Sequence, residues 1–272
     1  MTTTLLSRMD TRPLMPFGIE IVADGSRDLD EVDVEQLKTL LHQHKIVLLR
    51  GFASLDKEAF TGQARRFGQL LEWNFGPVLE LVVHKEPENY LFTKGNVPYH
   101  WDGAFAKVVP GIQFFQCVEA PDLGSGGETV FCDTPGVIDR ATPDELLAWQ
   151  RIEIAYRTEQ KAHYGGAIRQ SLIGRHPSTG RMTVRFAEPL NEESVQLNPL
   201  YLDIFDGDRQ LDASEAEAFL SKLIPRLYEP EIVYTHPWQS GDLLLTDNHS
   251  LLHGRRAFFA SSRRHIRRIH II

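Results

Sequence analysis

The sequence predicts a mainly β fold with flanking helices, a double-stranded β-helix of the jelly-roll, cupin-like kind. Three observations indicate it: short strand-like runs recur, helical patterns are few, and strands and helices do not alternate regularly. With 272 residues, 42% of them hydrophobic, the chain can bury a substantial core. Because β-sandwiches often reach this length undivided, we expect one domain over residues 1–272.

The N-terminal part predicts a helix, a strand and a second helix. Apolar residues recur at helical spacing over residues 34–41 and 60–67, and the apolar run IVLLR at 46–50 is strand-like. Residues 68–98 are irregular and rich in aromatic side chains. Such a long loop is typical of an active-site lid, and an ordinary surface loop explains the pattern equally well.

Strands dominate the remainder of the chain. The expected strands are residues 111–118, 128–133, 151–157 and 181–186, and the C-terminal runs EIVYTH, GDLLLTDN and HIRRIHII. The stretch between the strands at 151–157 and 181–186 is expected to be loop-rich.

Two further helices are indicated. Thr142 and Glu145 form a capping box with Pro143 at the first helical position, so a helix should run from there to about Gln150. Residues 213–228 also have helical spacing, and a proline near their end should terminate or kink the last turn.

Composition narrows the classes of function. A formal net charge of -8 argues against a general nucleic-acid binder, because phosphate binding needs a positive field. Cys117 and Cys132 form no CxxC pair, which fits buried thiols in a reducing compartment. No secretory signal and no run of about 18 apolar residues is present, so we expect a cytoplasmic protein without a membrane segment. A homo-oligomer is compatible with the sequence.

The segment His100-Trp101-Asp102 carries the chemistry. Side chains at i and i+2 of a strand share a face, so His100 and Asp102 can bind one metal ion while Trp101 points away. His253, far downstream, would complete a 2-His-1-carboxylate facial triad. That ligand set leaves octahedral iron(II) open on one side for a co-substrate and O2. Alone, a His-x-Asp is weak evidence, since a packed strand histidine explains it too.

The C-terminal context strengthens this interpretation. Asp247 to Gly254 closes a strand and enters a turn, and Arg264 begins the last strand after a short loop. A chelating 2-oxo acid has a second carboxylate, for which a fixed guanidinium is a bidentate partner.

The chain resembles the taurine dioxygenase (TauD/TfdA-like) family of iron(II)- and 2-oxoglutarate-dependent oxygenases over roughly residues 30–272. The matching motifs are the HxD (His100, Asp102), the DN-x-x-x-x-H (Asp247, Asn248, His253), the paired basic positions (Arg264, Arg268), the Gly-Gly-acid-Thr run (Gly126, Gly127, Glu128, Thr129) and the strand IVLLRGF.

The resemblance implies roles for these residues. His100, Asp102 and His253 would hold Fe(II), while Thr129 and Arg264 would share the distal carboxylate of 2-oxoglutarate, with O2 as co-substrate. Arg268 would contact the substrate anion. Further substrate candidates are Lys94, His163 and Arg185, and the aromatic Tyr99, Trp101 and Phe105, which could equally be core.

A closer resemblance is to the PvcB-like branch, through LLRGFA, FGQLLEWNFGPVLELV, VPYHWDGAF, the Arg175-His176-Pro177 turn and LLHGRRAF. The branch implies oxidative decarboxylation and desaturation of a tyrosine-type isocyano acid to a vinyl isonitrile. The alternative within the oxygenases is hydroxylation of a small carboxylate- or sulfonate-bearing substrate.

Other classes remain open at this point. A zinc hydrolase could use the same triad but would not explain Thr129 and Arg264. A non-catalytic cupin-like binding protein would not need the triad. The remaining polar residues near the motifs are expected to be solvated or packed: His249, His265, His270, Arg255, Arg256, Arg263 and Arg267.

Overall fold

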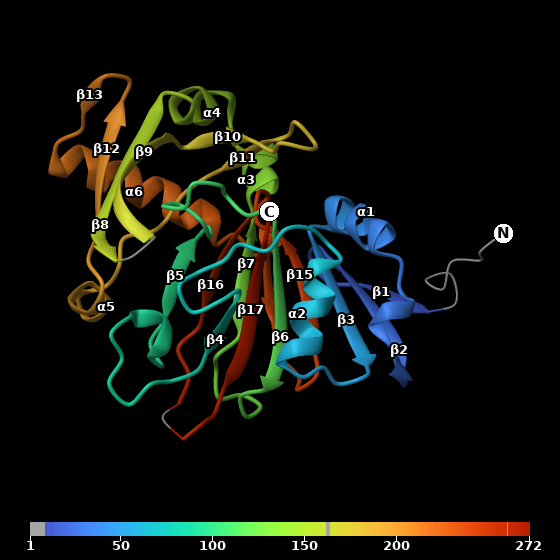
Figure 1. The fold of residues 1–272 in the computed structure, drawn as a ribbon. Helices are drawn as coiled ribbons and strands as arrows, with labels where there is room; N and C mark the ends of the chain where they lie inside the picture. Colours follow the sequence, from blue (N-terminus) through green and yellow to red (C-terminus); the bar gives the residue numbers. More distant parts are fainter. Residues whose placement is uncertain (1–8, 162–163, 260) are drawn as a thin grey trace.

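The computed structural model describes residues 9–161, 164–259 and 261–272, and two facing sheets form its centre (Figure 1). The larger sheet has seven strands in the order β1-β2-β3-β15-β6-β17-β4, and the smaller has the order β14-β7-β16-β5. The larger sheet comprises β1 (Asp10–Pro13), β2 (Ile19–Arg27), β3 (Ile46–Phe52), β4 (Val78–Leu81), β6 (Ile112–Glu119), β15 (Leu243–Asp247) and β17 (His265–Ile271). The smaller comprises β5 (Val97–His100), β7 (Thr129–Asp133), β14 (Val233–His236) and β16 (Leu251–Arg255). All pairs are antiparallel except β2 with β3.

An apolar layer joins the two sheets, as the jelly-roll prediction requires. Phe115, Leu244 and Ile266 of the larger sheet pack against Phe131 and Leu251 of the smaller one, and all five are buried. Because side chains alternate along a strand, the residues at every second position of β6, β15 and β17 point into this layer. The same layer holds the polar residues of the site.

Two helices cover the outer face of the larger sheet: α1 (Val34–His44) and α2 (Lys57–Arg65). Asp33 and Asp56 cap their first turns by accepting main-chain N–H groups. Leu37 of α1 and Phe60 of α2 pack on Phe114 and the other outward apolar residues of the sheet. The predicted helix-strand-helix order is confirmed.

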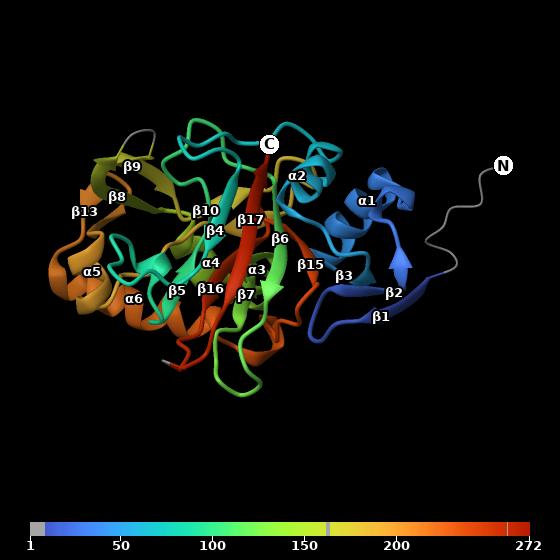
Figure 2. The same ribbon diagram turned by 60° about the horizontal axis from the view of Figure 1, so that its bottom comes forward.

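The smaller sheet is covered by a third layer that includes a four-stranded sheet, order β13-β12-β8-β9. Figures 1 and 2 show β8, β12 and α6 on one side of the central strands, with α1 and β1 to β3 on the other. This layer comprises β8 (Ile152–Lys161), β9 (Tyr164–Ser171), β12 (Leu200–Asp206), β13 (Arg209–Gln210), the hairpin β10 (Ile173–Arg175) and β11 (Met182–Val184), and the helices α3 (Thr134–Arg140), α4 (Pro143–Trp149), α5 (Glu192–Leu197) and α6 (Ala213–Leu227).

Several local predictions hold. The capping box at Thr142 starts α4, and Pro225 lies in the last turn of α6. Both cysteines are buried and free. In the described part of the chain, no helix is long and apolar enough to cross a bilayer.

Other local predictions were wrong. The stretch between β8 and β11 is not loop-rich, because β9 pairs with β8 and β10 with β11. β9 carries Gly165 and Gly166, which lower its apparent strand propensity in the sequence. The turn at residues 248–250 ends β15, so His253 lies within a new strand, β16, and not in a turn. The interval 68–98 contains β4 and a short 3-10 helix, Tyr90–Phe92.

Candidate active site

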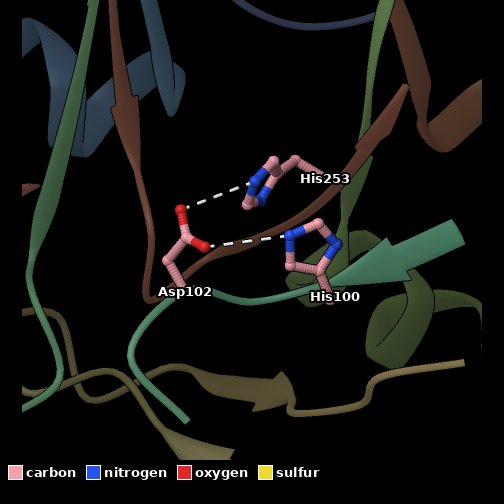
Figure 3. A group of neighbouring side chains, drawn as sticks. All are labelled: His100, Asp102 and His253. Atoms are coloured by element: carbon pink, nitrogen blue, oxygen red, sulfur yellow. Dashed lines mark ion pairs between the residues drawn. The ribbon is translucent and has the colours of Figure 1, made fainter. Parts of the chain in front are cut away.

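The three predicted metal ligands converge between the two sheets. His100 is the last residue of β5, Asp102 follows in the adjoining turn, and His253 is the central residue of β16. Cα register pairs His100 with His253, and their ring centroids are 4.2 Å apart. One ligand atom from each residue lies within 4.8 Å of the other two, so one ion can contact all three (Figure 3).

Asp102 lies between the two histidines. Its Oδ1 is 3.8 Å from His100 Nε2 and its Oδ2 is 3.6 Å from His253 Nε2. The Nδ1 atom of His100 is 3.0 Å from the carbonyl oxygen of Pro98, so Nδ1 donates and Nε2 keeps its lone pair toward Asp102. This is the orientation that a metal-binding histidine needs.

The charge states of the three groups suit metal binding. Burial lowers the pKa of His100, and burial together with the charge of His100 holds the pKa of His253 well below its usual value. Burial by itself would raise the pKa of Asp102, but Arg268, His253 and His270 outweigh it and hold that pKa well below normal. Two neutral imidazoles and one carboxylate are therefore present near neutral pH, and these forms bind metals.

Asn248 of the DN-x-x-x-x-H motif holds the main chain around Asp102 in place, and Asp247 holds the turn that contains Asn248. Asn248 accepts the N–H of Asp102 at 3.1 Å and donates to its carbonyl oxygen at 2.9 Å, which fixes the main chain of the turn. Asp247 faces away from the triad and accepts His176 Nε2 at 2.9 Å and Ser250 Oγ at 2.7 Å. Asn248 therefore positions Asp102, a predicted metal ligand, and Asp247 anchors the turn to the third layer.

Arg264 and Thr129 lie together beside the two histidines of the triad. Arg264 donates from Nη2 to Thr129 Oγ1 at 3.2 Å and from Nε to the carbonyl oxygen of Gly127 at 2.9 Å. Gly127 has φ +83°, and a Cβ there would lie 3.3 Å from Arg264 Cδ, so the glycine admits the guanidinium. A narrow cavity joins Thr129 and Arg264 to His100 and His253.

Arg264 has no carboxylate within ion-pair distance among the described residues, although it is buried. Burial lowers its pKa to about 9, which reflects a cation without a counter-anion. A buried guanidinium is costly unless paired. The site therefore fits a bound carboxylate such as the distal one of 2-oxoglutarate.

A second cavity of about 280 Å³ is lined by His100 and Asp102 of the triad and not by Arg264. Arg268 and His270 of β17 form its polar wall, beside His100 and Asp102. Its aromatic walls are Trp73, Phe75, Tyr90, Phe92 and Trp101. Several of these belong to the interval 68–98, so this interval borders the cavity. Its role as a lid stays a prediction.

Two of the predicted substrate contacts line this cavity, and the others that the structure describes do not. Arg268 and Trp101 line this cavity. Tyr99 does not, because alternation along β5 turns it away from His100 and into the core beside Tyr228. Phe105 packs on the same core, and Lys94 Nζ lies 3.3 Å from the carbonyl oxygen of Ser262.

Arg185 also lies elsewhere, with Nη2 3.0 Å from Nδ1 of His249, which lines a separate surface cavity. His163 falls outside the described residues.

Three residues near the site were missed or misjudged from the sequence. Gln113 of β6 and His270 donate to the carboxylate of Asp102, and both are buried. Arg255, expected to be solvated, is buried and donates to the main chain of residues 91–95. The only signal for Gln113 was that it is one of two glutamines, Gln113 and Gln116, within the mainly apolar run of β6.

A jelly roll with a 2-His-1-carboxylate cluster and a buried, unpaired arginine defines the class of facial-triad oxygenases that use a 2-oxo acid. The family model described as "Taurine catabolism dioxygenase TauD, TfdA family" matches residues 10–270. The chain therefore belongs to the TauD/TfdA family and is an iron(II)- and 2-oxoglutarate-dependent dioxygenase. The hydrolase and binding-protein alternatives fall away with this result.

Two sequence relatives and one solved structure are similar to this chain over most of its length. The chain is 49% identical to the 3-((Z)-2-isocyanoethenyl)-1H-indole synthase of Fischerella ambigua, over 98% of this chain and 96% of the relative. It is 39% identical to the tyrosine isonitrile desaturase of Pseudomonas aeruginosa, over 89% and 82%. The solved structure of PvcB, an Fe, alpha-ketoglutarate dependent oxygenase from an isonitrile synthetic pathway, matches with a TM-score of 0.78 and 33% identity, over 97% and 91%.

Proposed function

We propose that this dioxygenase converts an amino-acid-derived isocyano acid into a vinyl isonitrile by oxidative decarboxylation and desaturation. The substrate loses its carboxyl group as CO2 and two hydrogens, which leaves a carbon–carbon double bond. One O2 and one 2-oxoglutarate are consumed, and succinate, a second CO2 and water are formed. Relatives at 49% and 39% identity carry names that describe such products or reactions.

The observation that carries the proposal is Arg268 at the junction of the triad and the aromatic cavity. Arg268 is buried, and its Nη1 is 2.6 Å from Asp102 Oδ2. Its Nε is buried without a partner among the described residues. A substrate carboxylate in the cavity would satisfy that N–H, and a held carboxylate is what a decarboxylating desaturation needs.

The lining of the cavity also bears on the substrate's nitrogen. Asp102 is its only carboxylate among the described residues, and it already faces Arg268 and the triad. A free amino acid would bring an ammonium that finds no second anion there, and an unpaired buried charge is costly. An isocyano group is uncharged and avoids this cost.

Different residues of the chain would hold the metal, the 2-oxo acid and the substrate. Bound Fe(II) and 2-oxoglutarate supply the oxidising chemistry through O2. His100, Asp102 and His253 would hold the metal, while Thr129 and Arg264 would fix the distal carboxylate of the oxo acid. The aromatic walls exclude water and orient the substrate beside the triad.

The aromatic group of the substrate has two candidates. The sequence resemblance favours a tyrosine-derived acid, while the relative at 49% identity is named for an indole product. Asn198 borders the cavity, and its side-chain amide has no partner among the described residues. This amide could accept a hydrogen bond from a phenol or from an indole N–H.

The test uses the enzyme loaded with Fe(II) and 2-oxoglutarate and supplied with tyrosine- or tryptophan-derived isocyano acid. Mass spectrometry should show a product lighter by CO2 and two hydrogens, formed together with succinate. A product with one added oxygen and a retained carboxylate would contradict the desaturation and favour the hydroxylase.

A further inference from the structure

Three buried polar residues form a row across the larger sheet. Gln113 of β6 lies between Thr246 of β15 and His270 of β17, and each pair is in direct Cα register. Their exposed fractions are 0% for Thr246, 1% for Gln113 and 4% for His270. The row points into the layer between the sheets, where polar groups are costly unless they are hydrogen-bonded.

The row is directed at Oδ2 of Asp102, and Gln113 Nε2 also lies 3.4 Å from Nδ1 of His253. Thr246 Oγ1 donates to Gln113 Oε1 at 2.8 Å, which sets the amide so that Nε2 points the other way. Gln113 Nε2 donates to Asp102 Oδ2, and His270 Nε2 lies 2.8 Å from the same oxygen. An ionised carboxylate only accepts hydrogen bonds, so His270 donates from Nε2.

We propose that the Thr246–Gln113–His270 row is a positioning device for the metal-binding carboxylate. By occupying Oδ2, it leaves Oδ1 of Asp102, the oxygen nearest His100, to face the ion. The three residues act through Asp102, and Thr246 and Gln113 lie outside the lining of the substrate cavity. This inference rests on the proposed iron site.

The position of Asp102 explains why such a device is needed. Asp102 lies beyond the end of β5, and the next residue, Gly103, has φ +86° as the chain turns away. Asn248 fixes the main chain of Asp102 but leaves its carboxylate free to rotate. The row fixes that rotation from β6 and β17, which are held by their neighbours on both sides.

Arg268 cannot do this alone. It also contacts Oδ2, but it borders the cavity, where a substrate anion would compete for its guanidinium. Gln113 is absent from the lining of that cavity, so its hydrogen bond to Asp102 persists whether or not substrate is bound. The amide of Gln113 therefore holds the carboxylate in every state of the reaction, whereas His270, like Arg268, borders the cavity.

The experiment measures metal binding directly, under anaerobic conditions. Gln113→Leu and His270→Leu should weaken Fe(II) affinity by about 10- to 100-fold, the usual effect of losing a group that orients a metal ligand. They should also shift or weaken the absorption band of the Fe(II)–2-oxoglutarate complex. The matched control is Gln116→Leu, since Gln116 is a buried glutamine on the opposite face of β6.

Milder variants keep the test decisive if either leucine variant fails to fold. Thr246→Val removes only the hydrogen bond that orients Gln113 and should lower Fe(II) affinity less than Gln113→Leu. His270→Gln retains an N–H donor and should recover part of the affinity. Folded variants that bind Fe(II) like the parent, and show an unchanged band, would overturn the proposal.

His100→Ala separates this inference from the proposed iron site. If His100→Ala loses Fe(II) binding while Gln113→Leu and Thr246→Val keep it, the row has no positioning role and the iron site stands. If His100→Ala binds Fe(II) like the parent, the iron site itself is wrong, and the row falls with it.

Discussion

Arg255 on β16 donates to the carbonyl oxygen of Thr93 at 2.8 Å, which ties the strand of His253 to the segment that borders the substrate cavity. The same guanidinium donates to the carbonyl oxygens of Leu91 at 2.9 Å and Gly95 at 2.7 Å. Arg255 therefore holds this wall of the cavity in place, and it lies two residues after His253, a predicted metal ligand.

Arg255→Met should loosen this wall. Three main-chain oxygens would lose their donor, and a lost hydrogen bond to a charged group is worth about 1.5–3 kcal/mol. Hydrogen exchange of residues 89–95 should become faster, and the KM for the isocyano acid should rise at least about 10-fold. Arg256→Met, at an exposed neighbour, is the control. Unchanged exchange at 89–95 would show that Arg255 does not anchor the segment.

Arg264→Leu should raise the 2-oxoglutarate requirement. Loss of a charge-assisted hydrogen-bond partner costs about 1.5–3 kcal/mol, which corresponds to about 10- to 150-fold in the concentration needed for half-saturation. Succinate formation against 2-oxoglutarate concentration measures it. Arg263→Leu changes an exposed arginine one residue away and should leave the requirement as in the parent. Equal requirements in both variants would remove Arg264 from the co-substrate site.

Arg268→Lys should separate succinate formation from product formation. Lysine keeps the charge but loses the planar fork, so the substrate carboxylate would be held poorly. We expect the KM for the isocyano acid to rise about 10-fold or more, with more succinate formed per vinyl isonitrile. Arg267→Lys is the matched control, because Arg267 points to the other face of β17 and pairs with Glu80. A parent-like ratio of succinate to product in Arg268→Lys would contradict the assignment.

His249 should make the fold sensitive to mild acid. Burial, and then the charge of Arg185, lower the pKa of His249 from 6.5 to about 4. Between these pH values the unfolded chain binds a proton that the folded chain does not, so the free energy of unfolding falls as pH falls from about 6.5 to about 4. Urea melts at pH 7 and pH 5 should show a smaller fall in His249→Asn than in the parent.

The comparison for this experiment is His42→Asn, at an exposed histidine near the same surface cavity. It should retain the fall of the parent between pH 7 and pH 5. If His249→Asn and the parent lose the same free energy of unfolding, His249 is not responsible for the acid sensitivity.

Much of this site could be predicted from the sequence because its motifs are local. The i and i+2 spacing placed His100 and Asp102 near one ion, although the strand ends at His100 and a turn brings Asp102 round. Tyr99 was offered as a substrate contact or a core residue, and alternation along β5 turns it away from His100 and into the core. Spacing therefore predicted a cluster of possible ligands that the structure brings together, but it did not predict every wall of the cavity.

By itself the sequence determined the jelly-roll class, and it predicted the cluster of His100, Asp102 and His253 and the arginine for a carboxylate, Arg264, since each motif depends on residue types at short, fixed spacings. Only the tertiary structure decided that Gln113 and His270 hold the carboxylate of Asp102 and that Arg255 holds the wall of the cavity. Gln113 and His270 meet because two strands distant in the chain pair in one register. Alternation along a strand fixes the face of each side chain, but only the packed sheet fixes its neighbour.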